Sequence, residues 1–402
     1  MGTHVYDAIV VGGGPAGLSF ATNAARKGLK VLVLERDPGI GVFVRSSGGT
    51  WTEEAQLMEI PRELMNIIRG ARLVTPKGRI HDIYMRRGEG AVIDVRRYYQ
   101  HLAEVASSHG AEIRVASPVR DIAIKGEGVQ VSTLNEIIDG RILVDASGSW
   151  AWVRRRLRLL RSWSRYGVGV EYELYAPQPE QEDTVLIAVG SEFAPGGYAW
   201  IFPCGDRRVR IGVGILRPYS PEDPMRYLQR FLRHRIVKEF LGSRVSPLEF
   251  HAGVFPAQGL IAPLALDNVI FIGDAGGFGS PLLGEGIRFA YMSGAWGAEA
   301  AAQYIEGDPA ALKMFEKSAE HRLGLNFAVA LKLQEFVAKA PDHVLEKYSE
   351  AIAEMARRYP EVVISLLKTD VLGVAKRLSL PSAPSILKKL AELIKYATRF
   401  TR

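Results

Sequence analysis

The strongest restriction on the fold is a glycine-rich turn close to the N-terminus. A short apolar run, suited to a buried parallel strand, leads into Gly12, Gly14 and Gly17, which form a GxGxxG pattern. In such turns the first glycine permits the sharp bend, the second lets a pyrophosphate approach the backbone, and the third lets a helix pack closely on the strand. A second apolar run ends at Glu35, which is placed to accept hydrogen bonds from a ribose. This order predicts half of a Rossmann-like site for an adenine dinucleotide.

The kind of dinucleotide is indicated by a second glycine-rich segment, far along the chain. An apolar run, residues 269–272, ends at Asp274 and continues through a loop into a helix expected to begin near Gly286. Asp274 is suited to hydrogen-bond the hydroxyls of a ribityl chain, and the helix N-terminus can offer N–H groups to the pyrimidine edge of a flavin. Because a nicotinamide cofactor has no ribityl chain, the two segments together predict FAD.

Composition narrows the class of protein further. The chain has 402 residues, of which 47% are hydrophobic and 24% charged, and its formal net charge is +7. This length allows more than one domain with its own core. Basic residues are interspersed with acidic ones and no known nucleic-acid module is present, so no nucleic-acid partner is expected. The single cysteine, Cys204, excludes an intramolecular disulfide and argues against a thiolate metal site, so no metal is expected.

Three features bear on where the protein works. No run of about 20 apolar residues and no signal-peptide pattern occurs, which favours a cytoplasmic protein. The basic run at residues 152–165 is interpreted as a solvated helix face, with phosphate or membrane contact as the alternative. The amphipathic segment at residues 385–400 is interpreted as a terminal helix docked on its own domain. Its alternative is peripheral contact with the inner face of a membrane, which would help to collect a lipid.

A further pattern is PGGYAWIFPCGD, in which Tyr198, Trp200 and Phe202 occupy every second position. Alternate side chains of a strand point to one face, so the three rings share a face. Strands of this kind most often supply a plain core. The other interpretation is a pocket for an apolar substrate, where burial contributes about 25 cal/mol per Å² and aromatic faces can stabilise positive charge.

These segments divide the chain into three parts. A discontinuous, Rossmann-like FAD-binding domain of α/β type is expected from three pieces: residues 1–75, 91–165 and 256–320. Residues 166–255, joined by residues 76–90, read as successive strands and predict an antiparallel β-sheet that lies over the flavin as the substrate domain. An alternative start for the added segment is residue 70, so that residues 70–90 add a hairpin to the sheet. Residues 321–402 have the composition and spacing of helices, which predicts a helical C-terminal region.

In these segments the chain resembles a known family. GGGPAG with Glu35, VDASGSWAWVRR and the GD pair together resemble FAD-dependent oxidoreductases built like p-hydroxybenzoate hydroxylase. Within that group, PxxYxWxFP, the strand RIGVGI and the loop GDAGGFGSPLLGEGI resemble the geranylgeranyl reductase family, which includes archaeal digeranylgeranylglycerophospholipid reductases. The resemblance runs from residue 6 to about residue 300. It implies saturation of isolated double bonds in isoprenoid chains, which in this family belong to membrane-lipid precursors or to the prenyl tails of chlorophylls or quinones; membrane-lipid precursors are the expected substrate. The resemblance also favours the pocket over the core for the aromatic strand.

The resemblance also implies a set of cofactor-binding residues. Beyond the glycine turn, they are Ala16, Glu35, Arg36, Arg45, Ser46, Ser47, Gly49, Arg96, Val119, Asp274, Gly284, Gly286 and Ile287. The chain departs from the family pattern at two positions. Ser46 stands where reductases of archaeal lipids commonly carry a cysteine, and Val95 stands where an arginine is usual, so that Arg96 or Arg97 could substitute for it.

The reaction implied is transfer of a hydride from N5 of reduced FAD to one alkene carbon and of a proton to the other. Tyr198, Glu285 and Tyr291 are the expected proton donors. His251 is a fourth candidate, although a hydrogen-bonded sheet histidine is the simpler interpretation. The sequence does not identify the reductant of the FAD; NADPH, a ferredoxin acting as an electron-donor protein, and another reduced carrier are the alternatives.

Two other functions remain open on the sequence. A flavin monooxygenase or halogenase could use the same fold, but a halogenase usually needs a lysine near the flavin and the loop RSSGGTW contains none. An electron-transfer flavoprotein that reduces a quinone commonly carries an iron–sulfur cluster, which one cysteine cannot bind.

Overall fold

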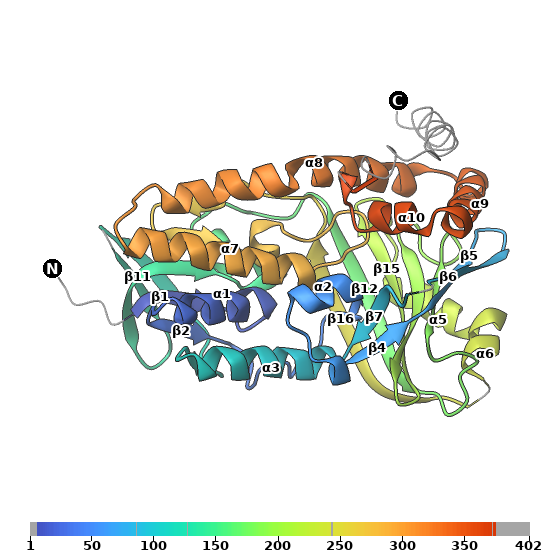
Figure 1. The fold of residues 1–402 in the computed structure, drawn as a ribbon, viewed down its shortest axis with the longest axis horizontal. Coiled ribbons are helices and arrows are strands. Elements are labelled where there is room, and N and C mark those ends of the chain that lie inside the picture. Colours follow the sequence, from blue (N-terminus) through green and yellow to red (C-terminus); the bar gives the residue numbers. More distant parts are fainter. Residues whose placement is uncertain (1–5, 86, 127, 243, 372, 375–402) are drawn as a thin grey trace.

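The computed structural model describes residues 6–374 apart from residues 86, 127, 243 and 372. The predicted amphipathic segment at residues 385–400 therefore lies outside the described residues. The described part contains an eight-stranded, a seven-stranded and a three-stranded sheet, with helices packed around the first two (Figure 1). Its architecture confirms the predicted fold class, a Rossmann-like α/β domain joined to a largely antiparallel sheet and to C-terminal helices.

The glycine-rich turn belongs to the eight-stranded sheet, whose centre is parallel. The parallel strands are, in spatial order, β18 (Val269–Phe271), β11 (Ile137–Asp145), β1 (Tyr6–Val11), β2 (Val31–Leu34) and β8 (Glu112–Arg114). The antiparallel strands are β17 (Ala265–Leu266), beside β18, and β10 (Gly128–Ser132) and β9 (Asp121–Lys125), which continue from β11. β2 and β18 are wholly apolar and buried, as are residues 8–11 of β1 and residues 142–144 of β11, because helices or other strands cover both faces of the parallel strands.

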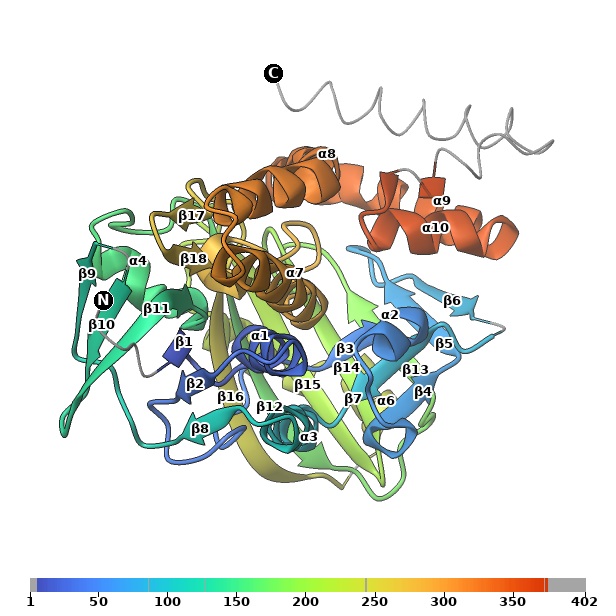
Figure 2. The ribbon, with the colours of Figure 1, turned by 60° about the vertical axis from the view of Figure 1, so that its left-hand side comes forward.

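Two helices that are far apart in the sequence pack together on this sheet. They are α1 (Pro15–Arg26) and α7 (Ile287–Ile305), and Figure 2 shows them one above the other beneath α8 (Ala311–Lys339). A Cβ at Gly294 would lie 2.3 Å from the Ala16 carbonyl oxygen, so glycine permits this close approach. The Ser19 hydroxyl donates to the Tyr291 carbonyl (2.7 Å) across the same contact. This packing fixes the start of each helix relative to the other.

The seven-stranded sheet forms the second domain. Its spatial order is β16 (Ser246–Pro256), β12 (Tyr166–Tyr175), β15 (Arg208–Arg217), β14 (Tyr198–Gly205), β13 (Thr184–Ala188), β5 (Gly70–Val74) and β6 (Ile80–Tyr84). Neighbouring strands are antiparallel except for the parallel pair β13 and β5. One apolar cluster on this sheet includes side chains of α5 (Pro224–Arg233) and α6 (Arg235–Leu241). β5 falls inside the range 1–75 that the sequence assigns to the FAD-binding domain, but it pairs in this sheet.

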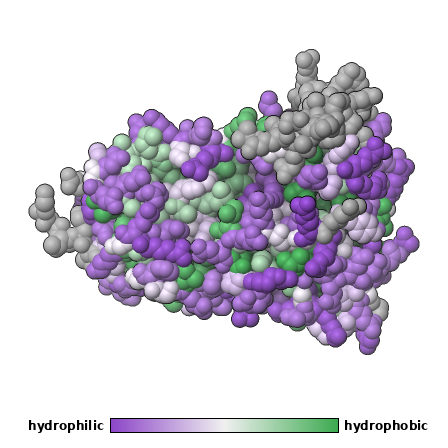
Figure 3. Space-filling model, in the orientation of Figure 1, coloured by the Kyte–Doolittle hydropathy of each residue, from purple (hydrophilic) through white to green (hydrophobic). Residues whose placement is uncertain are grey.

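The remaining elements connect the two domains. A small sheet of β3 (Gly49–Trp51), β7 (Gly90–Ile93) and β4 (Met65–Ile68) adjoins α2 (Thr52–Leu57) and α3 (Val95–Ser108). α8 runs from the FAD-binding domain towards α9 (Asp342–Arg358) and α10 (Pro360–Leu367), which lie beside the far edge of the large sheet (Figure 1). The face in Figure 3 is mostly hydrophilic with small hydrophobic patches. None of the helices in the described part of the chain has the length and apolarity needed to cross a bilayer.

The interpretation of residues 152–165 as a solvated face is wrong for Arg154. Within the short helix α4 (Trp152–Arg156), the Arg154 side chain is completely buried. Its guanidinium donates to the carbonyls of Ala275 (2.9 Å) and Pro263 (2.8 Å) and lies 4.1 Å from the Phe271 ring centroid. Burial lowers the pKa of Arg154 to about 10, with Asp145 opposing that shift. The residue therefore joins the strand ends of the FAD-binding domain and does not offer a surface charge.

Candidate flavin and substrate site

Two cavities adjoin at the glycine turn: the larger lies between the parallel sheet and the seven-stranded sheet, and the smaller is lined only by residues of the FAD-binding domain. The larger has a volume of about 590 Å³ and the smaller about 300 Å³. They share lining residues: Gly14, Arg36, Phe43, Arg45, Tyr99, Ala146, Ser147, Gly148 and Trp150. One elongated ligand could therefore extend through both.

The glycine turn forms the boundary between the cavities. Gly12 has φ +111°, and a Cβ there would lie 2.4 Å from the Ala146 carbonyl oxygen. A Cβ at Gly17 would lie 2.1 Å from the Gly12 carbonyl oxygen, so both positions require glycine for close packing. A Cβ at Gly14 would have no heavy atom within 4 Å and would enter the cavity. Since no side chain caps the N-terminus of α1, its free N–H groups face a space suited to a pyrophosphate.

The smaller cavity contains the predicted adenosine-binding residues. The Glu35 carboxylate accepts hydrogen bonds from the backbone N–H groups of Gly13 (2.6 Å) and Asp37 (2.8 Å). Val119, one of the predicted cofactor-binding residues, lines the same cavity. Arg36 and Arg45 line both cavities, and Arg45 forms an ion pair with Asp37 (3.2 Å). The two arginines supply positive charge beside the position of the phosphates.

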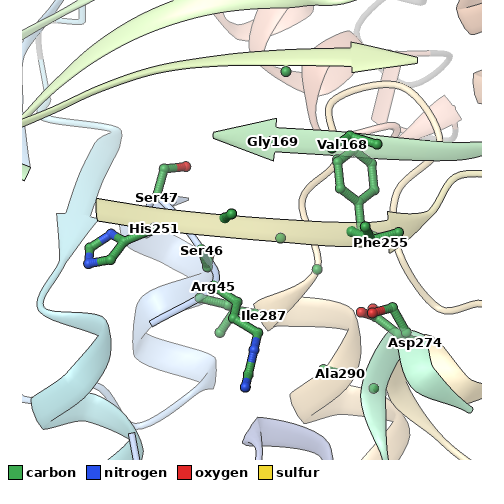
Figure 4. A pocket seen from close by; sticks show the side chains of 18 of the residues that line it. Arg45, Ser46, Ser47, Val168, Gly169, His251, Phe255, Asp274, Ile287 and Ala290 are labelled. Carbon is green, nitrogen blue, oxygen red and sulfur yellow. The ribbon is translucent and has the colours of Figure 1, made fainter. Parts of the chain in front are cut away.

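The larger cavity contains the residues that were predicted to bind the ribityl chain and the isoalloxazine ring of FAD. Asp274 faces it without accepting a hydrogen bond from any described residue, and burial raises the pKa of this carboxyl to about 6. α7 begins at Ile287, and its N-cap residue, Gly286, has no side chain that could bond to the first N–H groups of the helix. Both residues line the cavity, as do Ala16 and Gly284. In Figure 4, Asp274, Ile287 and Phe255 border this space from different elements. An acceptor without a donor, beside a free helix N-terminus, fits the ribityl hydroxyls and pyrimidine edge of FAD.

Of four other residues predicted to bind the cofactor, two line the larger cavity and two lie outside both cavities. Ser46 and Ser47 line the larger cavity. Gly49 does not line either cavity; a Cβ there would lie 3.0 Å from the Phe202 ring, so this glycine packs against β14. Arg96 also lies outside both linings and donates to the Val42 carbonyl (3.1 Å) and to Glu249 (2.7 Å).

The aromatic strand contributes two of its three rings to the larger cavity. Tyr198 and Trp200 line it, and their ring centroids are 5.7 Å apart. Phe202 continues the series at 6.1 Å from Trp200 but packs in an apolar cluster with Ile68 and Met85. The rings therefore share a face, as predicted, and the cavity ends before the third one.

The floor of the larger cavity is a row of glycines across the sheet. Tyr198 pairs with Gly214 of β15, which pairs with Gly169 of β12, which pairs with Gly253 of β16. We call Gly214, Gly169 and Gly253 the glycine row; all three line the cavity, and none has a left-handed φ. In the next register position, a Cβ at Gly212 would lie 2.3 Å from the Trp200 indole. Glycine is therefore needed on these strands to make space for the indole and for the cavity.

Comparison with known proteins agrees with this geometry. A model described as the geranylgeranyl reductase catalytic domain matches residues 166–254, and one described as FAD dependent oxidoreductase matches residues 7–150. Digeranylgeranylglycerophospholipid reductase 2 of Methanopyrus kandleri is 31% identical over 407 residues, covering 97% of this chain and 100% of the relative. The chain belongs to the geranylgeranyl reductase family. It is an FAD-dependent oxidoreductase, as the sequence predicts.

Solved structures show the same relationship. A geranylgeranyl bacteriochlorophyll reductase-like protein from Thermoplasma acidophilum is 25% identical, with a TM-score of 0.82 over 98% of this chain and 100% of that one. A flavin-dependent brominase superposes with a TM-score of 0.71 over 98% and 99% of the two chains. At 18% identity, the brominase shows only that the fold is shared.

Of the proton donors considered for this reductase-family chain, the structure places two at the cavity. Tyr198 lines it, donates to the Leu283 carbonyl (2.7 Å), and has its pKa raised to about 12 by burial. His251 also lines it. Glu285 instead accepts from Arg288 (2.9 Å) outside the lining, and Tyr291 packs between α7 and its neighbours, also outside the lining. Neither Glu285 nor Tyr291 therefore lies where it could pass a proton directly to an alkene in the cavity.

Among the cavity residues that the sequence analysis did not identify are two titratable ones, Tyr99 and Glu171. Tyr99, on α3, lines both cavities, and burial raises its pKa. Glu171 of β12 lines the larger cavity next to Trp200 and His251. The alternation of YGVGVEYE places Glu171 on the same strand face as Gly169, and this signal could have identified it once the pairing of the strands was known.

Proposed function

We propose that this protein uses reduced FAD to saturate isolated double bonds of geranylgeranyl chains in membrane-lipid precursors. The observation that carries the proposal is the larger cavity itself, in which aromatic rings stand beside the glycine row and directly adjoin the FAD cradle. The relatives from Methanopyrus kandleri and Thermoplasma acidophilum are both named for reduction of geranylgeranyl compounds, which supports the proposal.

The residues of the chain have separate tasks in this reaction. FAD, when bound and reduced, supplies the hydride. The glycine turn and Asp274 hold the cofactor, while Tyr198 and Trp200 bury the prenyl chain against the glycine row and exclude water. Each isoprene unit offers only apolar surface, so affinity comes from burial at about 25 cal/mol per Å². Much of the acceleration then comes from holding the alkene in place.

The test is to photoreduce the flavin of the purified protein without oxygen and add digeranylgeranylglycerophospholipid. Reoxidation of the flavin, with a mass gain of about two units for each reduced bond, is expected. Photoreduction removes any dependence on the natural electron donor, for which NADPH and a ferredoxin can then be compared directly. If only oxygen or a quinone reoxidises the flavin and the lipid mass is unchanged, the proposal fails.

The competing functions gain no specific support from the site. No lysine occurs among the described residues that line the cavities, whereas a halogenase usually needs one near the flavin. Cys204 is half-buried beside Phe202, and its removal from solvent raises its pKa to about 12. In the part of the chain that the structure describes, no group of three or more His, Cys, Asp or Glu could hold a metal ion.

A further inference from the structure

His251 is held between two carboxylates. Its Nδ1 lies 2.9 Å from Glu171 Oε1, and its Nε2 lies 3.0 Å from Glu249 Oε2. The pairing of β12 and β16 sets His251 opposite Glu171, while Glu249 is two residues away on the same strand face. The side chains of His251 and Glu171 are each only 5% exposed. An imidazole that contacts two carboxylates is arranged to carry a proton on both nitrogens.

These three residues connect the solvent to the larger cavity. At the outer end, Arg96 Nη2 lies 2.7 Å from Glu249 Oε2, and both side chains are more than one-third exposed. At the inner end, the Trp200 indole N–H donates to Glu171 Oε2 (3.0 Å). Glu171, His251 and Trp200 all line the cavity. The hydrogen bonds thus extend without a break from the surface to the space proposed for the prenyl chain.

The charges around His251 favour its protonated form. Burial alone lowers its pKa, but the hydrogen bonds to Glu171 and Glu249 outweigh burial, so that the pKa is raised above its usual value of 6.5. Arg210, from β15, opposes the rise and is itself paired with Glu173 (3.0 Å). The same hydrogen bond to His251 is the main cause that lowers the pKa of Glu249.

We propose that Glu171 and His251 supply the proton of the reduction and are recharged from solvent through Glu249. This inference rests on the proposed function. One alkene carbon receives the hydride, and the other forms its C–H bond with a proton from Glu171, which takes that proton from His251 Nδ1. The π electrons of the double bond form this second C–H bond. The imidazolium thereby becomes neutral and is restored by one proton from water through Glu249. Glu171 is the catalytic donor, and His251 acts through it.

Rapid mixing of the anaerobic, photoreduced holoenzyme with digeranylgeranylglycerophospholipid measures the step directly. In the unaltered protein, the rate of flavin reoxidation is expected to be constant at low pH and to fall as pH rises through the raised pKa of His251. Glu171→Gln and His251→Gln are expected to lower that rate at least about 100-fold and to abolish this pH dependence. His321→Gln, an exposed histidine on α8, is the matched control and should behave as the unaltered protein does.

A second readout does not depend on turnover. In protein labelled with ¹³C at the histidine ring, the signal lost in His251→Gln identifies His251. We expect it to titrate above pH 6.5 in the unaltered holoenzyme and at lower pH in Glu249→Gln, whose substitution at the half-exposed rim preserves the buried pair. An unshifted titration would overturn the inference.

The two proposals can fail separately. If the lipid reoxidises the unaltered protein while an FAD-bound His251→Gln shows the same rate and pH profile, the proton supply is wrong and the reductase function stands. If the lipid never reoxidises the unaltered protein, the function is wrong and the proton supply falls with it, whatever the titration shows.

Discussion

At the scale of single residues, Asp274 shows how the site is prepared for its cofactor. Its carboxylate faces the larger cavity, accepts no hydrogen bond from a described residue, and has its pKa raised from 3.8 to about 6 by burial. At neutral pH the folded protein therefore holds an ionised group that it does not fully solvate. Ribityl hydroxyls would supply the missing donors, so cofactor binding relieves a cost that folding has left in place.

Asp274→Asn is expected to stabilise the FAD-free protein and to weaken FAD binding. Because the folded-state pKa is raised, the cost is absent below about pH 4, grows between pH 4 and 6, and is complete above that. The gain in the free energy of unfolding should follow this course and reach at most about 3 kcal/mol. The FAD dissociation constant should rise about tenfold through loss of a charged acceptor.

Denaturant titrations of the FAD-free protein at pH 4 and pH 8, with fluorescence titration of FAD, measure both effects. Asp139→Asn, at an exposed position of β11, is the control and should change neither. If the Asp274→Asn variant is no more stable than the parent at pH 8, the assignment of this cost to burial is contradicted.

At the scale of elements, two glycines of the N-terminal glycine turn have different roles: Gly14 leaves room for the cofactor, and Gly17 lets the helix pack on the strand. Gly14→Ala should raise the FAD dissociation constant on the order of tenfold or more, since the methyl group enters the cavity where the pyrophosphate is expected. The fold should tolerate it, because Gly14 has an extended backbone (φ −84°, ψ −176°) open to any residue. Gly17→Ala should instead destabilise the protein itself, because its methyl group meets the Gly12 carbonyl oxygen at 2.1 Å. Thermal unfolding with and without FAD distinguishes the two outcomes.

The glycine row makes a separate prediction for the substrate. A Cβ at Gly169 would meet only Trp200, at 3.7 Å, so Gly169→Ala and Gly169→Val should fold and bind FAD normally. Both narrow the cavity, and valine does so more, so flavin reoxidation by the lipid should slow in the order glycine, alanine, valine. Gly324→Ala on α8, where a Cβ meets nothing within 4 Å, serves as the control. Equal rates in all variants would mean that the prenyl chain does not lie on this row.

At the scale of the whole molecule, α8 ties the C-terminal region to the cavity. Gln334 is 4% exposed, and its amide donates to the carbonyls of Ala257 (3.0 Å) and Pro281 (2.6 Å) while its oxygen accepts from Arg165 (3.1 Å). Gln334 and Pro281 also line the larger cavity. One side chain thus holds the loop after Asp274 in place from a different layer of the fold.

Gln334→Leu is expected to loosen that loop. It leaves two buried carbonyls without a donor, each at a cost of about 1–3 kcal/mol, so the melting temperature should fall by several degrees. The KM for the lipid should rise more than kcat falls, because the loop borders the cavity without carrying the chemistry. Gln303→Leu, at an exposed position of α7, is the matched control. An unchanged melting temperature would show that water replaces the lost donors.

The sequence could predict the parts of the site that depend on local order. Gly12, Gly14, Gly17 and Glu35 follow one another within a single strand–helix–strand unit, so their geometry follows from spacing. Asp274 could be located in the same way, because it follows closely after another apolar run, which forms β18. Arg154 was misjudged because three successive arginines look equivalent in sequence, and only the packing of α4 on the strand ends separates them.

Features that depend on strand register could not be predicted. Glu171 and His251 are 80 residues apart, and their contact exists only because β12 and β16 pair with that alignment. The same limit applies to Phe202. The alternation of the sequence places its ring on the correct face of the strand, but it does not show that the cavity ends at Trp200. β5 likewise pairs with β13, a strand much later in the chain, so the sequence could suggest a hairpin at residues 70–90 but not the strand beside which that hairpin lies.

Substitutions in the glycine row can change the volume of the cavity in one direction only. Gly169, Gly214 and Gly253 already carry the smallest possible side chain, so every substitution there subtracts volume and none adds any. Random variation can therefore restrict the range of substrates through the floor but cannot widen it. A bulkier substrate would instead require a smaller side chain in place of a large one that lines the cavity, such as Tyr198 or Trp200. Attempts to broaden specificity should accordingly begin at the aromatic wall and leave the floor untouched.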